Sequence, residues 1–489
     1  MTAVQSTAEW IGSVIKQNEI DKYLVNGQDF IDDRRIEEQL KQARPDPARI
    51  KDIIAKALDL QRLDPEETAA LIALSPREKD LWQQIYAAAG TIKNKVYGSR
   101  IVTFAPLYVS NLCVNDCLYC GYRSSNTKIR RKRLSDNELR AEIQALVSAG
   151  HKRLIMVYGE HPLSDVDYIA HTIQLAYETK VGNGEIRRAN INAAPLSIDQ
   201  LRLLKDIGIG TYQVFQETYH HATYRKLHPR GIKADYRWRL YALHRSLEAG
   251  ADDVAIGALF GLHDWRFEIM GLLYHAMDLE HHFGGVGPHT ISFPRLVPAV
   301  GTPFCTHSQH LVDDDTMERV IAILRLSVPY TGMILTCRES AAVRDRFLEL
   351  GVTQLDFGSN IGVGDYSTHD TELDKQQFIL QDTRSLDEGI RWLAQRGHLT
   401  SFCTAGYRCG RTGHYFMDIA KQGKVHTMCM PNAILTFQEY LLDYASPATR
   451  QAGEALIADT LAGMPATPLK DRLQQYVKRL RHGERDLYV

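Results

Sequence analysis

Short β-rich segments alternate with amphipathic helical segments from residue 101 to residue 357, and this alternation limits the fold more than any other feature of the chain. The β-rich segments are 101–109, 153–158, 189–193, 211–216, 253–260, 289–293, 332–336 and 352–357. Eight strand–helix units over roughly 260 residues match the size and order of a (β/α)8 barrel. A doubly wound open sheet would also alternate, but eight units favour closure. The sequence therefore predicts an α/β fold built on a (β/α)8 TIM barrel.

The regions on either side of the alternation have a different pattern. The N-terminal region carries apolar residues at helical spacing, and Asp46 followed by Pro47 is a helix-start signal. The C-terminal region combines helical segments with a cysteine- and glycine-rich loop at 403–413. We predict a helical N-terminal region (1–95), a barrel (96–375) and a mainly helical C-terminal domain (376–489).

Charge and hydropathy exclude several classes of partner. The 489 residues include 58 Lys and Arg against 59 Asp and Glu, so no net field attracts nucleic acid or anionic lipid. The sequence contains no apolar run long enough to span a membrane, and its first residues do not read as a secretory signal. We therefore expect a cytoplasmic protein with neither a nucleic-acid nor a membrane partner.

Cys113, Cys117 and Cys120 form a C-x3-C-x2-C motif directly after the first predicted strand. Three thiolates on one loop can ligate three corners of a [4Fe–4S] cluster and leave the fourth iron open. The open iron can chelate S-adenosylmethionine (SAM), and one electron then cleaves SAM to a 5′-deoxyadenosyl radical. The alternatives are a zinc knuckle, which would need a fourth nearby ligand, and chance clustering. The position of the loop at a strand end favours the cluster.

This cysteine spacing resembles the signature of the radical SAM superfamily. By that resemblance, Tyr119 occupies the aromatic position that flanks adenine, and Gly159 with Glu160 matches the element that meets the SAM amino group. Gly257 lies in a segment similar to the strand that packs against adenine. The structural alternatives are a helix-start acid at Glu160 and close packing at Gly257.

Residues 80–445 resemble, more specifically, the family of tyrosine lyases that includes the [FeFe]-hydrogenase maturase HydG and, more distantly, the 2-iminoacetate synthase ThiH. The resemblance is carried by residues 100–123, 150–162, 182–195, 208–220, 226–231, 289–299, 328–339, 409–420 and 430–447. It implies cleavage of the Cα–Cβ bond of L-tyrosine to p-cresol and dehydroglycine. For HydG it further implies conversion to CO and cyanide at a second iron–sulfur cluster, for assembly of the hydrogenase H-cluster.

The same resemblance implies a ferredoxin or flavodoxin as electron donor, and other hydrogenase maturases as partners. Two alternatives stay open. One is a ThiH-like 2-iminoacetate synthase that stops at dehydroglycine, and the other is an iron–sulfur scaffold or carrier without enzymatic activity. A carrier would not need a substrate clamp, so an intact SAM loop together with such a clamp favours an enzyme.

The candidate substrate clamp lies at the end of the seventh predicted strand. Thr336-Cys-Arg338-Glu339 matches the S/T-x-R-E motif of the family, and Arg338 can bind a carboxylate bidentately. The alternative for Arg338 and Glu339 is a surface ion pair. Arg295 and the pair Gln216 and Glu217 are further candidates for substrate or SAM contacts, or else structural hydrogen-bond partners.

The motif for a second cluster departs from the family pattern. Cys403 and Cys429 match the first and third ligands of C-x2-C-x22-C, but Gly406 occupies the middle position and has no side chain to bind iron. Either Cys409 replaces the missing ligand, or the cluster is absent and the reaction stops at dehydroglycine. The remaining cysteines, Cys305 and Cys337, match no cluster motif.

The family resemblance also implies that a histidine holds an extra iron near the second cluster. The two candidates are His275 and His289, which we expect near the barrel end closest to the C-terminal domain. A lone histidine is more often a satisfied core residue than a metal ligand.

Overall fold

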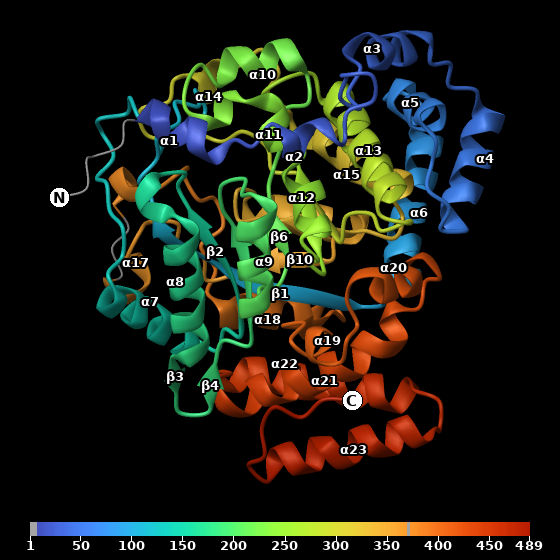
Figure 1. The fold of residues 1–489 in the computed structure, drawn as a ribbon. Helices are drawn as coiled ribbons and strands as arrows, with labels where there is room; N and C mark the ends of the chain where they lie inside the picture. Colours follow the sequence, from blue (N-terminus) through green and yellow to red (C-terminus); the bar gives the residue numbers. More distant parts are fainter. Residues whose placement is uncertain (1–6, 369–371) are drawn as a thin grey trace.

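The computed structural model describes residues 7–368 and 372–489, and a closed barrel lies at its centre (Figure 1). The barrel strands are β1 (Arg100–Ser110), β2 (Arg153–Tyr158), β5 (Arg188–Asn192), β6 (Tyr212–Gln213), β7 (Val254–Gly257), β8 (Thr290–Ser292), β9 (Gly332–Leu335) and β10 (Gln354–Asp356). Each strand pairs in parallel with the next, and β10 closes the ring on β1 through Val102 and Gln354. Within the described residues this is the predicted eight-stranded parallel barrel.

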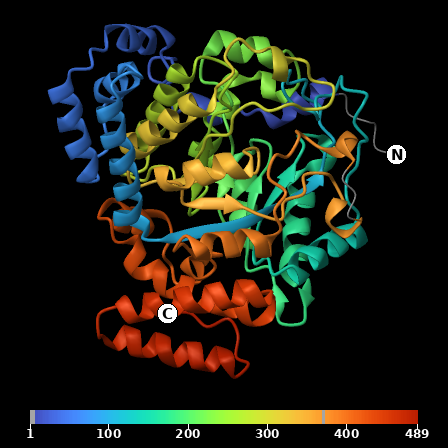
Figure 2. The same cartoon turned by 180° about the vertical axis from the view of Figure 1, so that it is seen from behind.

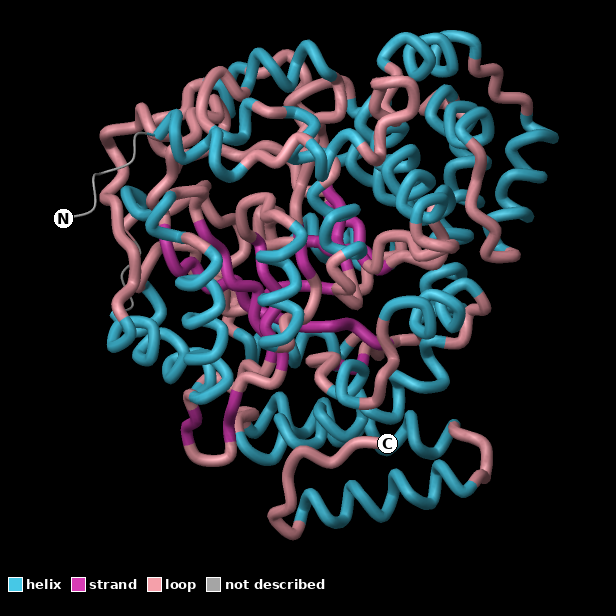
Figure 3. The backbone as a smooth tube through the Cα atoms, in the orientation of Figure 1, coloured by secondary structure: helices cyan, strands magenta, loops and turns pink. Residues whose placement is uncertain are grey.

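The strands are buried on both faces, as expected when helices cover a parallel sheet. All residues of β1 are buried, and the view in Figure 3 shows the strands gathered inside a shell of helices. Several strands are shorter than their β-rich segments. Strand β6, for example, ends at Gln213, whereas the apolar pattern continues to residue 216.

Helices of the barrel layer follow the strands along the chain. They are α7 (Asp136–Ser148), α8 (Val166–Glu178), α9 (Ile198–Ile207), α10 (His221–Leu227), α11 (Tyr236–Leu240), α12 (Ala242–Glu248), α13 (Trp265–His282), α14 (Phe304–His307), α15 (Asp314–Ser327), α16 (Ala341–Phe347) and α17 (Asp365–Thr368). A short antiparallel hairpin joins β3 (Lys180–Val181) to β4 (Gly184–Glu185). Four 3-10 turns complete this layer: Pro162–Ser164, Ile232–Ala234, Leu348–Leu350 and Leu373–Lys375.

The N-terminal helices α3 (Asp33–Gln42), α4 (Pro47–Leu58), α5 (Pro65–Ala73) and α6 (Lys79–Tyr97) form a layer along α13 and α15 (Figure 2). Two short helices precede them, α1 (Thr7–Val14) and α2 (Asn18–Asp21), and α1 lies apart from this layer, above α8 in Figure 1. The helix start predicted at Asp46 is confirmed, because its carboxylate accepts the backbone N–H groups of Ala48 and Arg49.

The C-terminal elements lie at the other end of the barrel from the cysteine loop of β1. They are α18 (Leu386–Gln395), β11 (Leu399–Ser401), α19 (Ala405–Arg408), α20 (Gly413–Lys421), α21 (Val425–Asp443), α22 (Pro447–Gly463) and α23 (Pro468–Arg481). Strand β11 pairs in parallel with the start of β1, with Arg100 opposite Leu399. This pairing places Cys403 beside the amino end of β1, roughly 30 Å from the loop at its carboxyl end.

The division of the chain at residues 95 and 375 stays a prediction. Strand β11 continues the barrel sheet, so backbone hydrogen bonds link the C-terminal part directly to β1.

Among the described residues, none of the helices combines the length and the apolar character needed to cross a bilayer.

Candidate active site

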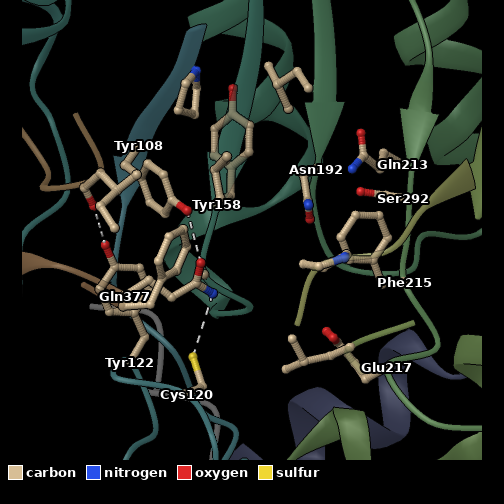
Figure 4. A pocket seen from close by; sticks show the side chains of 18 of the residues that line it. Tyr108, Cys120, Tyr122, Tyr158, Asn192, Gln213, Phe215, Glu217, Ser292 and Gln377 are labelled. Atoms are coloured by element: carbon tan, nitrogen blue, oxygen red, sulfur yellow. Dashed lines mark hydrogen bonds between the residues drawn. The ribbon is translucent and has the colours of Figure 1, made fainter. Parts of the chain in front are cut away.

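A cavity of about 190 Å³ opens at the carboxyl ends of the barrel strands. This is the end at which barrel enzymes carry their active sites. Its lining includes Cys113, Cys117, Tyr119, Cys120, Gly159, Glu160, Glu217 and Arg338 among the predicted site residues. The structure therefore brings residues from four separate stretches of sequence to one space, and Figure 4 shows two of them, Cys120 and Glu217, on opposite sides of the cavity.

The cysteine loop is held in place from both sides. The N–H of Val114 donates to the backbone oxygen of Glu160 at 2.9 Å, and the N–H of Leu118 donates to that of Leu227 at 3.1 Å. Two side-chain amides approach the thiols: Asn115 Nδ2 lies 3.6 Å from Cys113 Sγ, and Gln377 Nε2 lies 3.6 Å from Cys120 Sγ. The loop therefore presents its sulfur atoms among hydrogen-bond donors.

The thiols fit a soft metal cluster by their chemistry. Burial raises the pKa of Cys113 to about 11, so the free thiol stays protonated at neutral pH. Within the described residues, no three His, Cys, Asp or Glu side chains already surround one metal position. Three thiols with N–H donors and the Lys233 cation nearby nevertheless form a donor set that suits an anionic iron–sulfur cluster.

A network of charged and amide groups forms the cavity wall next to the cysteines. Glu160 accepts one hydrogen bond from Asn115 and another from Arg239, each at 2.8 Å. Glu217 accepts one from Lys233 at 2.7 Å. Burial alone would raise the pKa of Glu217, but Lys233 and Arg239 outweigh it and lower that pKa. Both carboxylates are therefore held in fixed positions, and the two cations keep Glu217 charged.

Glu217 has a left-handed backbone conformation, with φ of 72°. This conformation is uncommon for a residue with a side chain and costs roughly 1–3 kcal/mol. Its carbonyl accepts the N–H of Leu259 at 2.8 Å, which ties the end of β6 to the segment after β7. The strained backbone thus directs the Glu217 side chain into the cavity.

Gly159 is required by the close approach of two loops. A Cβ atom at this position would lie 2.1 Å from the backbone oxygen of Leu112, which directly precedes Cys113. We expect Gly159→Ala to destabilise the fold by about 1–3 kcal/mol and to displace the cysteine loop. Thermal unfolding and the iron content after reconstitution measure both effects. Gly12→Ala is the control, because nothing lies within 4 Å of its new Cβ; equal losses in both variants would contradict this role of Gly159.

Two aromatic residues complete the wall. The Tyr119 hydroxyl is 2.8 Å from His228 Nε2, so the ring is fixed against the cavity. Gly257 does not line the cavity itself. A Cβ there would lie 2.4 Å from the ring of Phe215, which does line it. Gly257 therefore makes room for Phe215.

Arg338 is the cation of the cavity that lacks an acidic partner. Its guanidinium lies over the Phe378 ring, 3.4 Å from the ring centre. Within the described residues no hydrogen bond or ion pair engages this side chain, and guanidinium groups stay protonated. Glu217 acts on Arg338 only across the cavity, so the donors of the guanidinium are available to bind a carboxylate bidentately.

Besides Gly257, three residues predicted to contact SAM or substrate do not line the cavity. Arg295 and Glu339 pair with each other, with 2.9 Å between Arg295 Nε and Glu339 Oε1, and Arg295 also binds Asp314. This network lies outside the cavity lining, so both are structural partners. Gln216 turns away from the cavity, and its Nε2 is 3.4 Å from the backbone oxygen of Tyr236.

Several residues that form the cavity were not predicted from the sequence. Asn115 and Gln377 come from loops, Lys233 from the 3-10 turn Ile232–Ala234 and Arg239 from α11, and their proximity to the cysteines depends on the folded barrel. Asn115 lies within the cysteine motif, and Lys233 follows the 226–231 segment that carries part of the family resemblance. Proximity to these two motifs is the signal in the sequence that could have identified Asn115 and Lys233 as site residues.

A second, much smaller cavity lies at the amino end of the barrel. Cys403 and Cys429 both line it, together with Gly406, Arg100 and Arg411, whereas Cys409 does not. A Cβ atom at Gly406 would meet only a backbone oxygen, at 3.8 Å, so a larger side chain has room there.

Positive charge surrounds the Cys403 sulfur. Burial alone would raise the pKa of Cys403, but Arg188 and Arg100 outweigh burial and lower it. Arg188 Nη1 lies 3.6 Å from Cys403 Sγ. Two sulfur atoms and a glycine do not provide the three thiols that hold a [4Fe–4S] cluster, so the residues lining this cavity do not fit that group.

The two candidate histidines lie in different places. His275 is buried, with its Nδ1 2.9 Å from the Tyr219 hydroxyl and its ring stacked on His244. His275 lies in α13, where its ring packs against Phe30 of the N-terminal region, and it does not line the second cavity. His289 lies closer to the C-terminal elements, with its ring centre 4.3 Å from that of Phe416.

A closed parallel barrel with a three-cysteine loop at its carboxyl end defines the radical SAM class of proteins. A model of the radical SAM superfamily matches residues 107–269, and a model of the biotin and thiamin synthesis associated domain matches residues 292–399. The 2-iminoacetate synthase of Escherichia coli (strain K12) is 32% identical over 333 residues, which cover 68% of this chain and 84% of that protein.

Two solved structures extend the likeness to nearly the whole chain. HydG, described as a maturase of the [FeFe]-hydrogenase, is 45% identical with a TM-score of 0.90, covering 94% of this chain and all of that one. HydG from Carboxydothermus hydrogenoformans is 36% identical with a TM-score of 0.78, and the match covers 95% of this chain and 99% of that one. The chain belongs to the radical SAM superfamily, in the family of the 2-iminoacetate synthases and HydG. That membership implies a [4Fe–4S] cluster and SAM.

Proposed function

We propose that the protein cleaves the Cα–Cβ bond of L-tyrosine to give p-cresol and dehydroglycine. The observation that carries this proposal is Arg338, a cation that no acid of the described residues hydrogen-bonds, in a cavity that also contains three thiols and aromatic side chains. Family membership supports the same reaction, because this family includes 2-iminoacetate synthases.

In this proposal Cys113, Cys117 and Cys120 hold the [4Fe–4S] cluster. Cluster and SAM together supply the radical that abstracts hydrogen from the substrate. The residues of the chain bind and orient the two molecules. Glu160, fixed by Asn115 and Arg239, faces the amino group of SAM, and Arg338 holds the tyrosine carboxylate so that its amino group lies beside SAM.

We expect Cys120→Ala to abolish p-cresol formation, because two thiols cannot hold the cluster against loss of iron. The assay combines anaerobically reconstituted protein, SAM, dithionite and L-tyrosine, with p-cresol measured by chromatography. Cys305→Ala is the matched control. Cys305 is buried next to the same loop, with its sulfur 3.2 Å from the Tyr119 backbone oxygen, but it does not line the cavity. Substantial p-cresol from the Cys120→Ala variant would contradict the ligand assignment.

The fate of dehydroglycine distinguishes two candidate products. Gly406 and the position of Cys409 outside the second cavity favour an enzyme that stops at dehydroglycine. The full-length likeness to HydG favours a further step to CO and cyanide. We propose the first route, since the second requires a cluster for which the cavity offers two thiols. Deoxyhaemoglobin added to the p-cresol assay tests the choice, and CO in amounts comparable to p-cresol would overturn it.

A further inference from the structure

Three polar side chains face the inner part of the main cavity and have no hydrogen-bond partner within residues 7–368 and 372–489. Asn192 ends β5, Gln213 ends β6 and Ser292 ends β8, and all three line the cavity. Asn192 and Gln213 are direct neighbours in the sheet, since their Cα atoms pair in register. Figure 4 shows the three side chains on the same side of the cavity, opposite Tyr108 and Gln377.

These groups lie at least partly inside the protein: Gln213 is 5% exposed and Ser292 is 1% exposed, and Asn192 is half-buried. Among the residues that the structure describes, none of the three side chains has a hydrogen-bond partner. Buried amides and hydroxyls are nearly always hydrogen-bonded, so an unpaired group in a cavity indicates a ligand or ordered water.

The facing wall has the opposite character. Phe104, Ile155 and Ile334 form an apolar cluster from β1, β2 and β9, and each of them lines the cavity. The inner cavity therefore has one apolar wall and one wall of amide and hydroxyl groups. Such a space suits a flat apolar ring with a single hydroxyl at its edge.

We propose that Asn192, Gln213 and Ser292 form the receptor for the phenol hydroxyl of the substrate and so select tyrosine over phenylalanine. This inference rests on the proposed tyrosine cleavage. In this arrangement Arg338 binds the carboxylate, the apolar wall contacts the ring, and the amides hydrogen-bond the hydroxyl. A substrate without the hydroxyl leaves those buried groups unpaired, which is the condition for strong discrimination.

The test compares affinities for L-tyrosine and L-phenylalanine. Equilibrium dialysis on the reconstituted, SAM-loaded enzyme should give wild type a preference for tyrosine of ~10²-fold. Asn192→Leu, Gln213→Met and Ser292→Ala, made separately, should weaken tyrosine binding ~10-fold or more while leaving phenylalanine binding within about threefold. Because there are three single variants, the test remains decisive if one of them does not fold. Gln395→Met is the control for Gln213→Met, since it replaces an exposed glutamine by methionine.

SAM affinity, and 5′-deoxyadenosine release without tyrosine, are measured on the same samples. A SAM affinity and a rate of 5′-deoxyadenosine release near those of wild type support the proposal. A loss of SAM affinity would show instead that Asn192, Gln213 or Ser292 contacts SAM, and would overturn it. An unchanged preference for tyrosine in all folded variants would overturn it as well. If wild type forms no p-cresol at all, the proposed function fails; if p-cresol forms and the preference is unaltered, the hydroxyl receptor alone fails.

Discussion

Replacing Arg338 by glutamine should reduce kcat/KM for L-tyrosine by ~10²- to 10³-fold, since the bidentate contact with the carboxylate is lost and the amino group is no longer positioned. The guanidinium has no acidic partner among the described residues, so its removal leaves no buried carboxylate unpaired. The fold should therefore be retained, with a melting temperature within a few degrees of wild type. Steady-state formation of p-cresol and of 5′-deoxyadenosine measures the effect. The variant should form more 5′-deoxyadenosine than p-cresol, because SAM cleavage becomes uncoupled from tyrosine cleavage.

Arg295→Gln is the matched control, because it makes the same exchange at an arginine outside the cavity. This variant breaks the contact with Glu339, whose side chain is 4% exposed, and should cost about 1.5–3 kcal/mol of stability. Its kcat/KM, measured below its melting temperature, should stay within severalfold of wild type. The assignment of the substrate clamp would be wrong if the Arg295 variant lost as much activity as the Arg338 variant.

Replacing Gly406 by cysteine should create a second cluster site and raise the iron content from about four to about eight per chain. The new Cβ has room, since its nearest contact is a backbone oxygen at 3.8 Å, and the thiol would join Cys403 and Cys429 at one cavity. Arg100 and Arg188 near Cys403 would favour the added anionic group. Iron and sulfide analysis and EPR of the reconstituted variant provide the measurement.

Two controls separate the explanations for this second site. Cys409→Ala should leave the iron content of wild type near four, because Cys409 does not line the cavity. Gly406→Ser has nearly the size of cysteine without its sulfur and should gain no iron. A wild-type content near eight that falls in the Cys409 variant would show instead that Cys409 acts as the substitute ligand.

The barrel was predictable from the sequence because burial on both strand faces leaves runs of apolar residues separated by amphipathic helices. The strand ends were less predictable. The apolar pattern of 211–216 continues past β6, because Val214 is buried outside the regular pairing. The pairing of β11 with β1 could not be predicted, because the strand Leu399–Ser401 is too short to show a β-type hydrophobic pattern in the sequence.

Motif residues indicated where the site lies but not which way each side chain points. Arg338 and Glu339 are adjacent in the sequence, and only Arg338 faces the cavity; Glu339 turns to Arg295. His275 was misplaced for the same reason, as a helical position does not show which neighbour its ring meets. Lys233 and Arg239 were not predicted, because each pairs with a carboxylate that is distant in the sequence: Lys233 with Glu217, 16 residues away, and Arg239 with Glu160, 79 residues away.

Whether the cavity binds a cluster that cleaves SAM next to tyrosine can be measured by anaerobic incubation of the reconstituted protein with SAM, dithionite and L-tyrosine. We expect an EPR signal of a reduced [4Fe–4S] cluster that changes when SAM is added, together with 5′-deoxyadenosine and p-cresol in comparable amounts. Protein that contains no such cluster after reconstitution, or that contains it and forms neither product, would show that the proposed activity is wrong.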